Sequence, residues 1–240
     1  MTPVHKALLD QLRAASRAPN PGFDPKSYSG TVSTSLNISA PVLRRIAKAW
    51  LADHKGAPVS QVLGLVGELV QGDSHDEKTL GLLMLEGLGR GRRPFGPAEV
   101  DRWLDHLVGW AEVDALCQSI FGPLDLLGDW PAWGGFIGRL ARDANIYKRR
   151  AALVLLTRTT RTDPDPRPRD LAFEMVEALK GEREIIITKA VSWLLRSMTS
   201  HHPAEVGRYL EAQGPTLPAI AVRETRIKLA TGRKTPRRAP

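Results

Sequence analysis

The chain has 240 residues, of which 42% are hydrophobic and 25% are charged. That is enough for one large globular domain or two small ones with a sizeable core. A single cysteine, Cys117, excludes an internal disulfide and a cysteine-based zinc cluster. No apolar stretch approaches the roughly 20 residues that span a bilayer, and residues 1–14 mix charged with apolar side chains instead of forming an apolar signal segment. We therefore expect a cytoplasmic protein that does not associate with membranes.

The charge balance is strongly basic, with a formal net charge of +8 and an isoelectric point of about 9.9. A surface of this kind favours polyanionic partners, which include nucleic acid, acidic lipid and acidic proteins. A genome rich in G and C would produce the same arginine excess without any such partner. The charge alone therefore leaves both interpretations open.

Apolar residues recur with helical spacing along most of the chain. In the first half, the segments with this spacing are 42–51, 62–70, 80–88, 100–108 and 113–121. In the second half, they are 136–141, 151–156, 171–179, 187–194, 206–210 and 227–229. No two alternating runs are joined by a tight turn, so we predict no strands.

Turn-forming residues separate these segments. They lie at 73–74, 91–94, 128–131 and 163–168, and Pro97 and Pro203 stand where a helix would begin. The predicted helices therefore arrive in pairs about every 35–40 residues, which is typical of HEAT-like α-hairpin repeats. Such pairs stack into a curved solenoid whose concave face suits an extended partner.

We accordingly predict an all-α HEAT-like repeat α-solenoid with a concave, positively charged groove. Residues 1–230 would form a single domain. Residues 231–240 carry Arg233, Lys234, Arg237 and Arg238 between prolines. That composition predicts a disordered basic tail.

The first candidate site is the pair Trp110 and Asp114. These residues are four apart, so on a helix they share one face. A tryptophan and a carboxylate on one face could form part of a binding or catalytic surface. The alternative is a core tryptophan next to a surface aspartate.

The second candidate site is a run of three cations, Lys148, Arg149 and Arg150, at the opening of an apolar helix. Cations at this end oppose the helix macrodipole by a few tenths of a kcal/mol each. A bound anion would remove that penalty, because helix N-termini bind phosphate well. The alternative is a basic edge that is simply solvated.

The third candidate site is the set Lys189, Trp193 and Arg196, which lie on one helical face. The opposite stripe, formed by Ala190, Val191, Leu194 and Leu195, can supply the contacts with the core. An aromatic side chain framed by two cations, on a face that burial does not need, indicates a binding surface. The alternative is a partly buried tryptophan between solvated cations.

Taken together, these segments resemble the AlkD-like family of DNA alkylation repair glycosylases, over residues 28–229. Pro41 is followed three residues later by Arg44, as in the family's early helix. Trp110-x-x-x-Asp114 matches its catalytic helix, and residues 145–152 match a segment that usually reads Asn-Ile-Trp-x-x-Arg-Ala-Ala. Residues 189–196 match the helix with the second active-site tryptophan, and residues 223–228 resemble the terminal helix. Two positions depart from the family pattern: Asn37 stands where Gly is common, and Tyr147 replaces the usual Trp.

The resemblance implies an enzyme of base excision repair that releases cationic alkylated purines from double-stranded DNA without a cofactor or metal. A monomer is the simplest case for a groove that must receive duplex DNA. N7-alkylguanine and N3-alkyladenine are the implied lesions, and bulky N3-adenine adducts are a secondary expectation. Asp114 would stabilise the developing sugar cation and position water. Trp110 and Trp193 would wall the site, because aromatic faces attract cations. The residues expected to contact the DNA backbone are Arg44, Lys148, Arg149, Arg150, Lys189 and Arg196.

Two other classes of protein are compatible with the pattern. One is a non-catalytic HEAT-like module that binds structured or damaged DNA. The other is a protein–protein scaffold, which would have no affinity for plain duplex DNA. A metal-dependent nuclease is disfavoured, since the six histidines show no ligand spacing beyond the adjacent pair His201 and His202.

Overall fold

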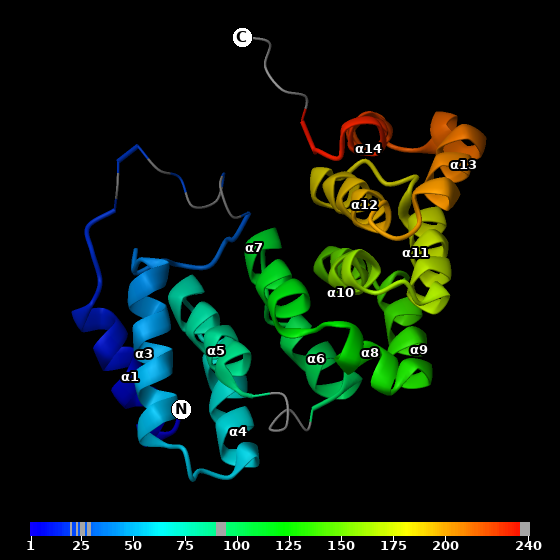
Figure 1. Cartoon of the computed structure of the whole chain (residues 1–240). Coiled ribbons are helices and arrows are strands. Elements are labelled where there is room, and N and C mark those ends of the chain that lie inside the picture. Colours follow the sequence, from blue (N-terminus) through cyan, green and yellow to red (C-terminus); the bar gives the residue numbers. More distant parts are fainter. Residues whose placement is uncertain (20, 23, 25–26, 28–29, 90–94, 236–240) are drawn as a thin grey trace. The chain divides into compact units, whose positions relative to one another are not determined.

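The computed structural model describes residues 1–19, 21, 22, 24, 27, 30–89 and 95–235 (Figure 1). Regular structure in these residues is helical, apart from one isolated bridge between Thr34 and Ser74, as the sequence predicted. Internal contacts divide the chain into two compact units, residues 1–120 (unit 1) and 121–240 (unit 2). Among the described residues, no helix is long and apolar enough to cross a membrane.

Unit 1 is organised around α5 (His75–Gly87), which packs against α1, α3, α4 and α7. The bounds of the other helices are Pro3–Ala14 for α1, Ala40–Asp53 for α3, Val59–Val70 for α4, Pro97–Leu104 for α6 and Trp110–Asp114 for α7. The π-helix η2 (Ala115–Ile120) continues directly from α7. Apolar residues with the predicted spacing face the core, for example Val62, Val66 and Leu69 of α4, which are almost completely buried.

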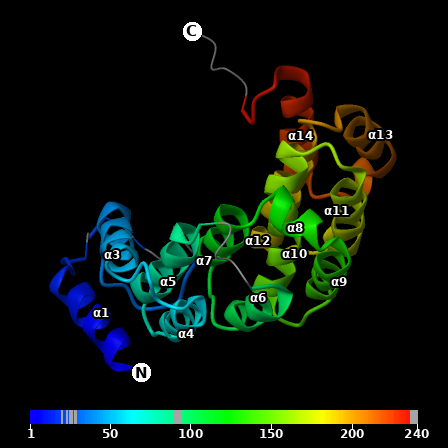
Figure 2. The ribbon, with the colours of Figure 1, turned by 60° about the horizontal axis from the view of Figure 1, so that its bottom comes forward.

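Unit 2 consists of two rows of helices (Figures 1 and 2). One row contains α10 (Ile146–Thr162), α12 (Ile185–Met198) and α14 (Ala219–Thr231), and each helix packs against the next. The other row contains α9 (Trp130–Leu140), α11 (Pro166–Leu179) and α13 (Pro203–Gln213). The short helices α8 (Pro123–Gly128) and η3 (Gly214–Thr216) complete the unit. Alternation between two rows is the arrangement expected for α-hairpin repeats, whereas a solenoid through both units and its charged groove stay predictions.

Helix α10 is enclosed by its neighbours in unit 2, because α8, α9, α11 and α12 all pack against it. Residues 151–156 are completely buried, and the burial of each leucine among them contributes about 1.5–3 kcal/mol to the stability of the fold. The hydroxyls of Thr157 and Thr160 are also buried, and each donates a hydrogen bond to a carbonyl of its own helix at 2.8 Å. These two hydroxyls are therefore tolerated in the core because their hydrogen bonds are satisfied, whereas the buried hydroxyl of Thr159 on the same helix has no hydrogen-bond partner among the described residues.

Local signals in the sequence explain where several helices begin. Pro97 and Pro203 are the first residues of α6 and α13, as predicted. Asn145 caps α10 by accepting a hydrogen bond from the backbone N–H of Tyr147 at 2.9 Å. Ser74 and Glu77 form a capping box at the start of α5.

Asn37 has a left-handed backbone conformation, with φ of +56°. Glycine adopts this conformation without steric cost, and asparagine is among the few other residues that tolerate it. The departure from the family pattern at this position is therefore conservative for the backbone.

Some sequence expectations need correction. The apolar spacing in 113–121 predicts one regular helix. In the structure, the chain is instead π-helical from Ala115 to Ile120. The helix α1 was not among the expected helices. Thr231, assigned to the tail, is the last residue of α14, while residues 232–235 follow it without regular helix. The expected turn at 91–94 and the end of the tail, 236–240, lie outside the described residues.

Candidate functional site

The pair Trp110 and Asp114 occupies the two ends of α7, and both side chains are half-buried. Glu112 and Val113, between them, are buried. This pattern agrees with the expected shared face, since residues two apart on a helix point in different directions. The two carboxylate residues of α7 therefore differ in exposure: Glu112 is buried, whereas Asp114 is partly accessible to solvent.

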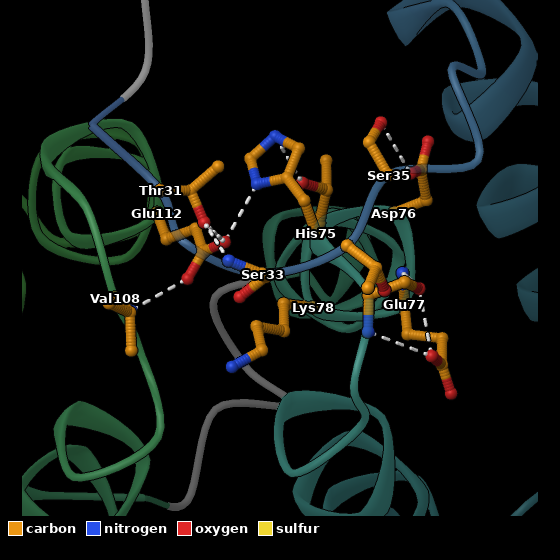
Figure 3. A network of polar contacts seen from close by, with 12 residues as sticks. Thr31, Ser33, Ser35, His75, Asp76, Glu77, Lys78, Val108 and Glu112 are labelled. Carbon is orange, nitrogen blue, oxygen red and sulfur yellow. Dashed lines mark hydrogen bonds and ion pairs between the residues drawn. The ribbon is translucent and has the colours of Figure 1, made fainter. Parts of the chain in front are cut away.

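Glu112 is surrounded by hydrogen-bond donors from three separate segments (Figure 3). Its Oε1 accepts from the Thr31 hydroxyl at 3.0 Å and lies 2.7 Å from Nδ1 of His75. Its Oε2 accepts from the backbone N–H of Val108 at 2.8 Å. The carboxylate thus ties α7 to the loop before α3, to the first residue of α5, and to the connection from α6.

The loop before α3 lies very close to the start of α7, and two glycines permit this. Gly109 has φ of +111°, and a Cβ there would lie 2.7 Å from the backbone nitrogen of Thr31. Gly30 has φ of +66°, and a Cβ there would lie 3.0 Å from Cδ1 of Trp110. The indole of Trp110 is therefore packed against the backbone of this loop.

The start of α5 holds the rest of the same loop. Asp76 is buried, and its carboxylate accepts from the backbone N–H groups of Leu36 at 2.7 Å and Ile38 at 3.1 Å. Lys78 is also buried and donates to the backbone carbonyl of His106. Acidic residues in the first turn of a helix also interact favourably with its dipole.

In unit 2, the three cations at the start of α10 have different surroundings. Lys148 and Arg150 are 6% and 5% exposed, and Arg150 donates to the carbonyl of Ile186. Arg149 forms a two-pronged ion pair with Glu182, at 2.6 and 3.2 Å, and donates to two backbone carbonyls. The alternative of a solvated basic edge is therefore wrong, because Lys148 and Arg150 are buried and Arg149 is paired with Glu182, which precedes α12.

The face of α12 opposite its core contacts carries the third predicted set. Ala190, Val191, Leu194 and Leu195 are completely buried, as expected. Lys189 is exposed and Trp193 is half-buried. Arg196 is not a solvated cation, because its side chain is only 16% exposed and its Nε lies 3.2 Å from a carboxylate oxygen of Glu224 on α14. Burial lowers the pKa of Arg196, and the negative charge of Glu224 partly offsets this.

Arg44, the remaining predicted contact, lies exposed on α3 in unit 1. With Lys48 it borders a cavity of about 370 Å³, lined on its apolar side by Ala47, Leu51 and Leu83. Arg44 and Lys48 are four residues apart and therefore share a face of the helix.

The structure brings Trp110 and Asp114 together in unit 1, and Lys148, Arg149, Arg150, Lys189, Trp193 and Arg196 together on two packed helices of unit 2. Sequence reasoning missed the groups that hold these residues, namely His75, Glu112 and Glu224. Glu112 was visible as a second carboxylate inside Trp110-x-x-x-Asp114. Among the described residues, no cluster of three His, Cys, Asp or Glu side chains is arranged to hold a metal ion.

The described residues define an all-helical protein with an aromatic and carboxylate pair in unit 1 and a basic cluster in unit 2, and comparison with known proteins identifies its family. Residues 23–229 match the family described as DNA alkylation repair enzyme, and the chain belongs to this family. It is similar in fold to a solved structure described as a predicted DNA alkylation repair enzyme from Enterococcus faecalis. The sequence identity is 16% and the TM-score 0.57, with 96% of this chain and 97% of the other covered. No curated protein matches the sequence.

Proposed function

We propose that this protein is a DNA glycosylase that hydrolyses the N-glycosidic bond of cationic alkylated purines in duplex DNA. The observation that carries the proposal is the difference in exposure between the two carboxylate residues on α7. Glu112 is sealed among hydrogen-bond donors, whereas Asp114 is partly accessible and shares a helical face with Trp110. In a chain of this family, that leaves Asp114 as the carboxylate of α7 that can approach a substrate.

The chemistry of the substrate explains why one carboxylate suffices. A purine alkylated at N7 or N3 already carries positive charge, so it leaves without being protonated by a general acid. As the C1′–N bond breaks, positive charge develops on the deoxyribose. An ionised Asp114 would stabilise that charge and orient the attacking water. The faces of Trp110 and Trp193 would attract the cationic base and sugar with about 0.5–2 kcal/mol each.

The basic residues would supply affinity for the DNA backbone. Lys189 and Arg44 are exposed and suited to phosphate contacts, which are independent of sequence and sensitive to salt. Lys148, Arg149, Arg150 and Arg196 already have protein partners or are buried. A role of these four in DNA binding requires that a phosphate join or replace those contacts. Bulky N3-adenine adducts remain a secondary proposed substrate.

The test is single-turnover release of 7-methylguanine from a defined duplex, with the wild type and Asp114→Asn compared at saturating enzyme. We expect release by the wild type and near-complete loss in the variant, with duplex affinity retained. Release that is unchanged in Asp114→Asn would refute the assigned role. Duplex binding without release by the wild type, on methylated and bulky-adduct duplexes alike, would instead indicate a non-catalytic module for structured or damaged DNA.

A further inference from the structure

The carboxylate of Glu112 is completely buried, although it lies on a helix of only five residues. Burial of an ionised carboxylate costs several kcal/mol unless donors surround it. The Thr31 hydroxyl, the His75 imidazole and the Val108 N–H supply those donors at 2.7–3.0 Å. These contacts hold α7, the first turn of the helical segment that η2 continues, in its position.

The three donors lie in three different segments of the chain. Thr31 belongs to the loop before α3, His75 is the first residue of α5, and Val108 precedes α7. Thr31 is itself held, because its hydroxyl also accepts from the backbone N–H of Ser33 at 3.2 Å. The network therefore fixes the start of α7 from both the loop and the α5 side (Figure 3).

We propose that Glu112, with Thr31 and His75, is a positioning network that holds Trp110 and Asp114 in the geometry needed for base release. This inference rests on the proposed glycosylase function. Glu112 acts through α7 and does not touch the substrate, since its carboxylate is sealed. A displacement of about 1 Å in a reacting group can lower a rate by about 100-fold, so loss of the network should affect the chemical step more than binding.

Glu112→Gln is a conservative variant that removes the negative charge of Glu112 and can keep the geometry of its hydrogen bonds. An ionised carboxylate only accepts, so Nδ1 of His75 must carry its hydrogen here. In Glu112→Gln, the amide oxygen can accept from Val108, while the two amide N–H groups can donate to Nδ1 of the other imidazole tautomer and to the hydroxyl oxygen of Thr31, which then acts as an acceptor. Glu112→Gln should therefore preserve the position of α7, whereas Glu112→Ala should not.

The chain offers a matched control in Glu77. Its carboxylate is also buried and accepts from Ser74, and it lies 3.0 Å from Nε2 of His5, so it ties α5 to α1 rather than to α7. Glu77→Ala should cost stability, as Glu112→Ala does, without moving Trp110 or Asp114. A general effect of losing a buried carboxylate would appear equally in both variants.

The experiment measures single-turnover release of 7-methylguanine at saturating enzyme, together with duplex affinity, for the wild type and these variants. We expect Glu112→Ala to lower the rate by about 100-fold with affinity within threefold. Glu112→Gln should stay within fivefold of the wild type, and Glu77→Ala should be unchanged. If Glu112→Ala is folded and its rate equals that of Glu77→Ala, the network has no positioning role. If Glu112→Ala does not fold, Thr31→Val, which removes one donor, replaces it in the same comparison with an expected loss of about fivefold.

A second readout does not depend on activity. With fluorinated tryptophan, the resonance of Trp110 is assigned by its loss in Trp110→Phe. We expect this resonance to shift in Glu112→Ala and to stay in place in Glu77→Ala. A wild type that releases no base refutes the proposed function. In that case the Trp110 resonance decides the positioning role alone, and an unshifted resonance overturns it.

Discussion

Replacement of Gly109 by alanine should destabilise the protein strongly, because the backbone there suits only glycine. Its φ of +111° and ψ of 152° lie in a region that other residues hardly adopt, at a cost of about 1–3 kcal/mol. The new Cβ would also lie 2.7 Å from the nitrogen of Thr31 and 2.8 Å from the carbonyl carbon of Gly30. These are backbone atoms, so no side-chain rotation can relieve the contact.

Relief therefore requires that the loop move away from α7. Such movement weakens the buried hydrogen bond between Thr31 and Glu112, which adds about 1 kcal/mol. We expect Gly109→Ala to lower the free energy of unfolding by about 2–4 kcal/mol. Urea unfolding followed by tryptophan fluorescence measures this difference.

Gly64 provides the matched control. It lies in the middle of α4, and a Cβ there would meet no atom within 4 Å. Gly64→Ala should raise the free energy of unfolding by about 0.5–1 kcal/mol, because alanine loses less backbone entropy in a helix. A Gly109→Ala protein with the midpoint of the wild type would refute this account of the contact between the loop and α7.

Three further predictions follow from other features. Asn37→Gly should leave stability nearly unchanged, while Asn37→Ala should lower it by about 1 kcal/mol in the same urea assay, since alanine disfavours a positive φ. Lys189→Ala should reduce the slope of log K against log salt for duplex binding by about 1, whereas Arg149→Ala should reduce it by less, because a phosphate must first join or replace the ion pair with Glu182. Burial and the nearby charge of Arg169 lower the pKa of His202 below its ordinary 6.5, so the free energy of unfolding should decrease as the pH falls below about 6.5. His202→Gln should remove part of this decrease. If the free energy of unfolding depends on pH in the same way in both proteins, His202 is not the cause.

Much of the fold was predictable because its signal is local. The spacing of Val62, Val66 and Leu69 identifies the buried face of α4, and Pro203 identifies the start of α13. The placement of Trp110 and Asp114 on one helix was predictable for the same reason, since they lie four positions apart.

The groups that hold the site were not predictable in this way, because their partners are distant in the sequence. Asp76 and Lys78 look like the polar face of a helix, yet both are buried, because Leu36, Ile38 and His106 provide their partners. Periodicity likewise predicted the buried residues of 113–121 but not the change to π winding at Ala115. A change from α to π winding does not alter the positions of the apolar residues in the sequence. It alters only the directions in which their side chains leave the helix axis.

The π winding of η2 gives the segment an angular offset that a regular helix would lack. Each residue of an α-helix advances by about 100°, whereas a π turn holds about one residue more, so the same residues turn through a smaller total angle in η2. Trp110 and Asp114 precede η2, whereas the buried residues Leu116 and Ile120 lie within it and anchor it in the core. If all the residues of η2 wound as a regular α-helix, Trp110 and Asp114 would turn by about 100° relative to the chain that follows η2. Deletion of one residue within η2 would restore regular winding with little change of that angle, because the π turn already accommodates the extra residue. The direction in which Trp110 and Asp114 face is thus set partly by the winding of this segment.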